Sequence, residues 1–85
     1  MAYQIQIEKS ALKQLSKIEK AAREKIRVTI NGLANNPRPF GYKKLVDEGG
    51  LYRIKAGDYR IIYEVQDKIL FVSVLRIAKR NERTY

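Results

Sequence analysis

Residues 51–65 read LYRIKAGDYRIIYEV, and this stretch decides how the rest of the chain is arranged. Two segments rich in Tyr and Ile flank Gly57-Asp58, and a two-residue Gly-Asp link between such segments is typical of a tight II′ hairpin turn. The turn fixes the strand pairing, because side chains alternate along a strand and opposed residues share a face. The predicted pairs on the apolar face are Ala56 with Tyr59, Ile54 with Ile61, and Tyr52 with Tyr63.

The second face of this predicted hairpin is cationic. It carries Arg53, Lys55 and Arg60, with Lys55 directly opposite Arg60 and Ile62 opposite Arg53. Like charges across a strand pair repel each other, so a sequence selected only for stability would tend to avoid this arrangement. The cationic cluster therefore indicates a site at which something anionic binds.

Composition limits the kinds of protein that the chain can form. Its 85 residues are enough for one domain, residues 1–85, with a single core. Cysteine and histidine are absent, which excludes disulfides and thiolate chemistry and removes the usual zinc ligands and the usual catalytic base. We therefore expect no metal and no cofactor. The sequence shows neither an apolar run of membrane-spanning length nor a signal peptide, so we expect a cytoplasmic protein that does not bind a membrane.

Charge points to the class of partner. Eighteen Lys and Arg against nine Asp and Glu give a net charge of +9, which makes nucleic acid the first expected partner and an acidic protein the second. A basic surface that serves only solubility is the alternative. Charge alone does not decide among these interpretations.

The first third of the chain predicts a strand and two helices. Residues 2–7 alternate apolar and Gln side chains, as expected for a strand with one buried face at a sheet edge. Apolar residues then recur at spacings of three and four, which is typical of an amphipathic helix; they are Ala11, Leu15, Ile18, Ala22, Ile26, Ile30 and Leu33, with Leu12 widening the stripe. One unbroken helix over residues 10–33 would be about 36 Å long, against about 23 Å for a seven-residue strand. We therefore expect a bend near Lys20.

The outward side chains of these helices are mostly cations, and Lys13, Lys17 and Lys20 stand out among them. They form either a solvated helix face or a surface that contacts phosphates. After a loop over residues 35–40, a short extended piece at 41–46 is expected to bring Lys43 and Lys44 toward the cationic cluster.

The last strand is expected over residues 69–76, which read ILFVSVLR. A two-residue turn before it would put Leu70, Val72 and Val74 on the helix-packed face, whereas a three-residue turn would put Ile69, Phe71 and Leu75 there. We favour the first. The order of one strand, two helices and then three strands in an antiparallel meander predicts an α+β fold with the helices on one face of the sheet.

Four stretches together resemble a RelE-type toxin of the RelE/ParE superfamily: the N-terminal MAY, the hairpin LYRIKAGDYRIIYEV, the strand ILFVSVLRI and the terminal KR…Y. The resemblance covers nearly the whole chain and implies a fold like that of microbial ribonucleases. It also implies a type II toxin that cleaves mRNA in the ribosomal A site and is neutralised by a cognate RelB-like antitoxin. The family's site positions fall here on Arg53, Lys55, Arg60, Arg80 and Tyr85. The spacing from Arg80 to Tyr85 is a residue shorter than in the best-known member.

Chemistry suggests a role for each of these residues. Cleavage of RNA by its own 2′-hydroxyl needs a base, cations around the phosphorus oxygens, and protonation of the leaving 5′-oxygen. Without histidine the base must be Lys55, whose charged form is disfavoured by the crowding of Arg53, Arg60 and Arg80. Arg60 is suited to stabilise the oxyanion. Arg80 either donates the proton to the leaving oxygen or only stabilises that oxygen, and Tyr85 can stack on a splayed base.

Two other functions stay open from the sequence. A relative resembling ParE would poison DNA gyrase, although such relatives lack this basic set. A non-catalytic RNA-binding or interaction module would bind phosphate through the same cations and cut nothing.

Overall fold

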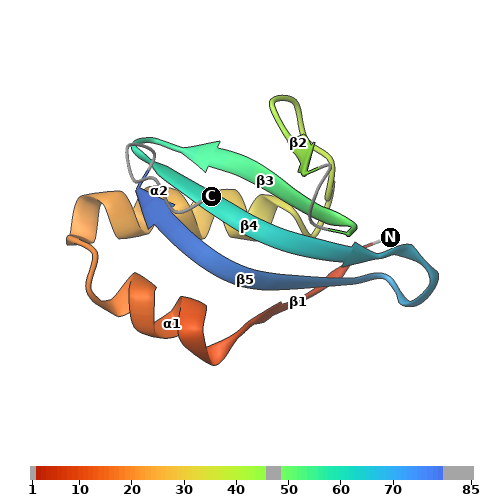
Figure 1. Ribbon diagram of the computed structural model, residues 1–85, viewed down its shortest axis with the longest axis horizontal. Helices are drawn as coiled ribbons and strands as arrows, with labels where there is room; N and C mark the ends of the chain where they lie inside the picture. The colour runs from red at the N-terminus through yellow and green to blue at the C-terminus, as the bar shows by residue number, and fades with distance from the viewer. Residues whose placement is uncertain (1, 46–48, 80–85) are drawn as a thin grey trace.

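Residues 2–45 and 49–79 are described by the computed structural model, and they form two helices and one five-stranded sheet (Figure 1). In chain order the elements are β1 (Gln4–Ile7), α1 (Lys9–Ser16), α2 (Lys20–Gly32), β2 (Lys43–Leu45), β3 (Leu51–Ala56), β4 (Tyr59–Gln66) and β5 (Phe71–Lys79). A short 3-10 turn, Asp67–Ile69, joins β4 to β5.

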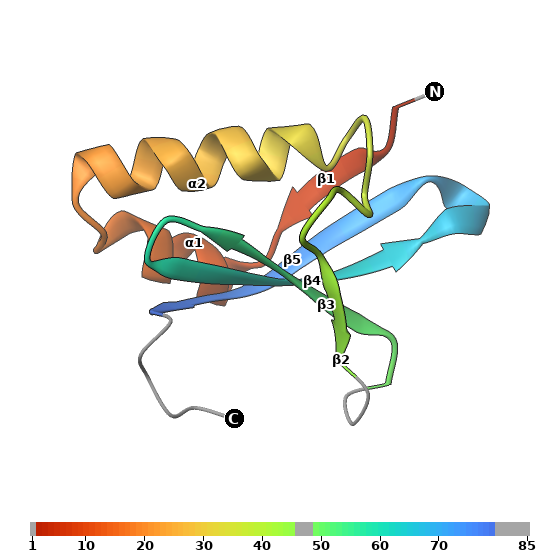
Figure 2. The same ribbon diagram turned by 90° about the horizontal axis from the view of Figure 1, so that it is seen from above.

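The sheet has the strand order β1-β5-β4-β3-β2. β1 runs parallel to β5, and every other neighbouring pair is antiparallel. Both helices lie on one side of the sheet (Figure 2), where α2 contacts β3 and β4 while α1 contacts β5. The predicted α+β fold is therefore confirmed, including the edge position of the first strand and the meander of the last three. β2 adds a short strand at the opposite edge.

The β3–β4 hairpin has the predicted register. Lys55 pairs with Arg60 and Arg53 with Ile62, while the three apolar pairs fall as expected. Gly57 has a φ of +62°, the left-handed value that the first central residue of a II′ turn requires and that glycine adopts at least cost. The helix-facing side of the hairpin is buried, with Ile54, Ala56, Ile61 and Tyr63 in the core.

The predicted bend separates α1 from α2. α1 begins after Glu8 and ends at Ser16, and α2 begins after Glu19. The predicted apolar stripe lines the core, with Ala22 half-buried against it. The prediction that Leu12 widens this stripe was wrong, because its side chain is 48% exposed. None of the helices within residues 2–45 and 49–79 is long and apolar enough to cross a bilayer.

The connection into β5 is longer than both sequence alternatives, and its length is even, as in the two-residue alternative that we favoured. Four residues, 67–70, separate Gln66 from its partner Phe71, and Leu70 adopts a left-handed conformation with φ +52°. Because four residues preserve the same alternation as two, Val72 and Val74 face the helices and are fully buried, as we favoured. The prediction was wrong for Leu70, which lies in the connection, because the strand begins at Phe71 and ends at Lys79 and not at residues 69 and 76.

A β-bulge in β5 then changes which side chains face which way. Tyr63 pairs with Val74, but Ile62 pairs with Arg76, so Leu75 is the extra residue. Without this bulge Arg76 would face the helices; with it, Arg76 lies on the other side and Ile77 returns to the core. A single added residue thus places a cation on the solvent side of the sheet.

Side chains of α1 cover the outer edge of β5. β1 pairs with β5 only as far as Val74, so the backbone groups beyond that point have no strand neighbour on this edge within the described part of the chain. Ser10 Oγ donates to the carbonyl of Leu75 at 3.3 Å, and the N–H of Ile77 donates to Gln14 Oε1 at 2.7 Å. Ser10 and Gln14 are four residues apart and share one side of the helix. The helix therefore replaces a strand at this edge.

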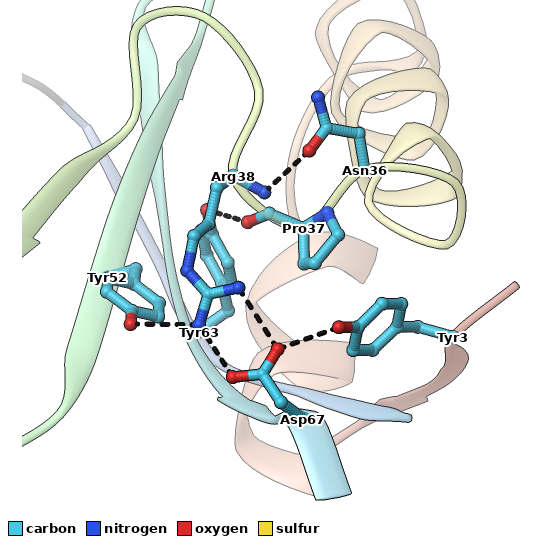
Figure 3. Close-up of polar contacts among 7 residues, drawn as sticks. All are labelled: Tyr3, Asn36, Pro37, Arg38, Tyr52, Tyr63 and Asp67. Carbon is cyan, nitrogen blue, oxygen red and sulfur yellow. Dashed lines mark hydrogen bonds and ion pairs between the residues drawn. The ribbon is translucent and has the colours of Figure 1, made fainter. Parts of the chain in front are cut away.

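A polar cluster holds the segment between α2 and β2 against the sheet (Figure 3). Arg38 donates Nη1 to Asp67 Oδ1 at 3.1 Å and Nη2 to Oδ2 at 2.8 Å, and its guanidinium lies 5.2 Å from the centre of the Tyr52 ring. Tyr3 donates its hydroxyl to the same carboxylate at 2.7 Å. The hydrogen bonds from Arg38 and then Tyr3 lower the pKa of Asp67 to about 2, and the hydrogen bond to Asp67 raises the pKa of Arg38.

Buried Tyr63 fixes the same segment from inside the core. Its hydroxyl donates to the carbonyl of Pro37 at 2.7 Å, and burial raises the pKa of Tyr63, so the phenol keeps the proton that it donates. Pro37 and Arg38 are thus held from two sides, by the core and by the surface carboxylate. Because this segment leads into β2, these contacts set where Lys43 lies.

Candidate functional site

The side of the sheet turned away from α1 and α2, which we call the open face, carries the cationic cluster. Two neighbouring rungs of opposed residues run across it. The first rung is Lys55, Arg60 and Ala78; the second is Lys43, Arg53, Ile62 and Arg76. No position in these two rungs is acidic, so the strands gather positive charge without a compensating carboxylate in either rung.

The cations differ in how firmly the sheet holds them. Arg53, Arg60 and Arg76 are half-buried, whereas Lys43 and Lys55 are exposed. The Nε atom of Arg53 is shielded from solvent and makes no hydrogen bond within residues 2–45 and 49–79. A buried donor without a partner costs free energy, so the sheet holds Arg53 in place at some cost to stability.

The other predicted binding residues fall into two separate places. Lys13 lies exposed on α1, Lys17 directly follows that helix, and Lys20 begins α2. Lys43 and Lys44 lie on β2, which β3 and β4 separate from β5, the strand that α1 contacts. Lys43 joins the open face beside Arg53, but Lys44 is opposite Tyr52 and faces the other side. Arg80 and Tyr85 lie outside the described residues.

Arg76 is a cation of the open face that was not predicted from the sequence. The bulge at Leu75 places it opposite Ile62, in the same rung as Arg53. The signal for it is the interval between core residues: Val72 and Val74 are two apart, but the next, Ile77, follows after three. That interval predicts one extra residue in the strand, and hence a bulge.

This arrangement suits the binding and polarisation of a phosphodiester. Arg53 and Arg60 carry permanent charge on paired strands and can donate two hydrogen bonds at once to phosphate oxygens. Lys55 lies between them along the hairpin and, unlike arginine, can lose its proton. The β3–β4 hairpin thus combines two arginines, which stay charged, with a lysine on the open face.

Comparisons with known proteins agree on the kind of protein. A family model described as the ParE toxin of the type II toxin-antitoxin system parDE matches residues 5–84. The chain is 31% identical to the toxin RelE of Mycobacterium tuberculosis over 80 residues, which cover 93% of this chain and 82% of that protein. It is 30% identical to the mRNA interferase toxin RelE of Escherichia coli K12 over 82 residues, or 94% of this chain and 85% of that one.

Two solved structures are similar in fold as well as in sequence. The archaeal RelE-RelB complex from Pyrococcus horikoshii matches with a TM-score of 0.84 and 32% identity over 96% of this chain and 99% of that one. The intact RelBE toxin-antitoxin complex of E. coli matches with a TM-score of 0.80 and 28% identity, over 95% and 100% respectively. The chain belongs to the RelE/ParE superfamily of type II toxin-antitoxin toxins, as a RelE-type member.

Proposed function

We propose that this toxin is an mRNA interferase that cleaves mRNA in the ribosomal A site, through attack of a 2′-hydroxyl on the adjacent phosphate. The observation that carries the proposal is the pairing of Lys55 with Arg60, with Arg53 and Arg76 in the next rung of the open face. The E. coli K12 relative named an mRNA interferase supports it. Action on ribosomes would place the activity in the cytoplasm.

In the proposed reaction each cation has a separate task. Lys55 takes the proton of the 2′-hydroxyl as general base. Arg60 and Arg53 stabilise the negative charge that builds on the phosphorus oxygens. Arg80 stabilises the departing 5′-oxygen and Tyr85 stacks on a splayed base; both assignments rest on the family resemblance alone.

We further propose that a cognate RelB-like antitoxin neutralises this toxin. Similar toxins are seen in complex with RelB in the solved P. horikoshii and E. coli structures. With a net charge of +9 on this chain, the antitoxin segment should combine acidic and apolar residues and order itself as it binds. Co-expression of the partner should restore growth, and a neighbouring product that neither binds nor rescues would contradict the proposal.

The decisive experiment is cleavage of mRNA on programmed ribosomes by the purified toxin. Wild type should cut within the A-site codon, and mapped 5′ ends of transcripts after induction should show the same positions. Arg60→Ala should lose most of this activity, while Arg27→Ala, at an exposed position of α2, should retain it. Binding to ribosomes without any cut would leave a non-catalytic RNA-binding module instead.

A gyrase poison is the second candidate, because the matching family model carries the ParE description. The cations of the open face favour RNA over gyrase, since a run of fixed charges on a sheet suits a phosphate chain. A supercoiling assay with purified gyrase, run beside the ribosome assay, separates the two. Inhibition of gyrase with no cleavage of ribosome-bound mRNA would overturn the interferase.

A further inference from the structure

Part of the open face carries aliphatic side chains beside the cations. A shallow hollow of about 210 Å³ lies next to the second cationic rung and is lined by Leu51, Ile62, Leu75 and Arg76. We call it the open-face hollow. Of these four described residues three are aliphatic, and the fourth carries a guanidinium.

The β-bulge creates this hollow. In a regular strand Leu75 and Arg76 would face opposite sides, but both line the hollow because the bulged residue and its successor share one position opposite Ile62. Leu51 closes the hollow from β3, two residues before Arg53 in the same strand. The bulge therefore places an apolar floor and a planar cation side by side.

The hollow lies at the distance from Arg53 that one nucleotide can bridge. Residues two apart in a strand are about 7 Å apart and point to the same face, so Leu51 and Arg53 lie in line on the open face. Arg53 is half-buried on this face, and its guanidinium can donate to a phosphate oxygen. The base of the same nucleotide or its neighbour then reaches the hollow.

We propose that the open-face hollow seats one base of the bound mRNA, with the Arg76 guanidinium stacked on the ring and Leu51, Ile62 and Leu75 packed around it. This inference rests on the proposed interferase function and adds a contact that reads or holds the codon. A base suits such a wall because its flat faces are apolar and stack on arginine, while its edge stays polar.

The next rung supplies groups for that polar edge. Leu51 is opposite Glu64, and Glu64 is opposite Ser73, so the half-buried carboxylate of Glu64 lies on the open face beside the hollow, next to the buried Ser73. Bases carry both donors and acceptors along their edges. An aliphatic side chain of a protein partner would neither form hydrogen bonds with these polar side chains nor stack on the Arg76 guanidinium. The residues around the hollow therefore favour RNA as the occupant.

A double-mutant cycle between protein and RNA tests this contact. Single-turnover cleavage is measured on ribosomes whose A-site codon is intact or has an abasic nucleotide at one of its three positions. At one position, base removal should slow wild type about tenfold, as expected for one stacked base. Leu75→Ala should slow cleavage of intact mRNA to a similar extent. The two changes together should cost no more than either alone.

Arg76→Lys provides a second variant that keeps the charge but loses the planar stacking surface. It should show the same coupling to the same codon position. Leu12→Ala, the same change at an exposed leucine of α1, is the matched control and should act like wild type with every mRNA. Thermal unfolding of each variant checks that the fold is retained.

The outcomes separate this inference from the proposed function. Cleavage by wild type with purely additive effects of Leu75→Ala, Arg76→Lys and base removal at all three positions would overturn the base site and leave the interferase standing, whether or not the variants weaken antitoxin binding. Absence of cleavage of intact mRNA by wild type would overturn the interferase, and the base site with it.

Discussion

Lys55 is the residue on which the proposed mechanism depends most. It is exposed, and it is opposite the fixed charge of Arg60. If Lys55 accepts the proton of the 2′-hydroxyl, Lys55→Arg keeps the charge and removes a group that can be deprotonated. We expect ribosome binding to persist and single-turnover cleavage to fall by roughly 10²-fold or more, the usual contribution of a general base.

A pH series distinguishes this role from simple charge stabilisation. Under the base mechanism the wild-type rate rises with pH, while Lys55→Arg stays slow throughout. Arg60→Ala should cost on the order of 3 kcal/mol of transition-state stabilisation in either case, as for the loss of one oxyanion donor. Near-normal cleavage by Lys55→Arg would remove Lys55 as the base.

Asp67 should make the free energy of unfolding fall as the solution becomes acidic. Its pKa of about 2 in the folded protein lies below the ordinary value of 3.8, so its hydrogen bonds with Arg38 and Tyr3 contribute fully above about pH 4 and are lost as the pH falls toward 2. Asp67→Asn should therefore lower the free energy of unfolding near neutrality and flatten its decline between pH 4 and 2. Urea unfolding at a series of pH values measures both effects.

Asp58→Asn is the matched control for this experiment, because Asp58 is an exposed residue of the hairpin turn. It should keep the wild-type dependence on acid pH. An unchanged pH dependence for Asp67→Asn would show that the ion pair with Arg38 seen here does not stabilise the protein in solution.

At the scale of elements, the features set by neighbouring residues could be predicted. The Gly57-Asp58 turn fixes the hairpin register, and the spacing of Ala11, Leu15 and Ile18 predicts a buried helix face. Even the facing of Val72 and Val74 was correct although the turn is longer than expected, since only the parity of its length matters.

Features that depend on contacts between distant residues could not be predicted from the sequence. The contacts of Arg38 with Asp67 and of Tyr3 with Asp67 join positions 29 and 64 residues apart, and no local pattern selects these partners. The three-residue interval between Val74 and Ile77 is a local signal of the bulge at Leu75. The position of Arg76 opposite Ile62, however, can be known only once the strand pairing of the sheet is known. The sequence thus predicted the open-face cations of the β3–β4 hairpin but not Arg76 on β5.

Gln14 links α1 to the sheet through a hydrogen bond that can be tested. The N–H of Ile77 belongs to a buried residue and bonds Gln14 Oε1 at 2.7 Å. Gln14→Ala should leave this donor without its partner and destabilise the protein by about 1–3 kcal/mol. Urea unfolding measures the change. Gln66→Ala, at an exposed end of β4, should have little effect, and equal losses for both variants would contradict the edge-covering role of α1.

At the scale of the whole molecule, positive charge is spread over two surfaces. The open face holds Arg53, Arg60 and Arg76, whereas Lys13 lies on α1 and Lys17 directly follows it, and α1 packs against β5 on the opposite side of the sheet (Figure 2). The proposed function places mRNA on the open face. We propose that Lys13 and Lys17 contact other RNA of the ribosome.

This division predicts how ribosome binding depends on salt. Replacing Lys13, Lys17 and Lys20 together by Gln removes three positive charges, so the slope of log affinity against log salt should become shallower by about 2 if all three contact RNA phosphates. Cleavage by bound toxin should be unchanged, because none of these residues lies on the open face. The matched control replaces Lys25, Arg27 and Lys68, which are exposed elsewhere, and changes the net charge equally. If both triple variants alter the slope to the same extent, net charge and not a surface on α1 governs binding.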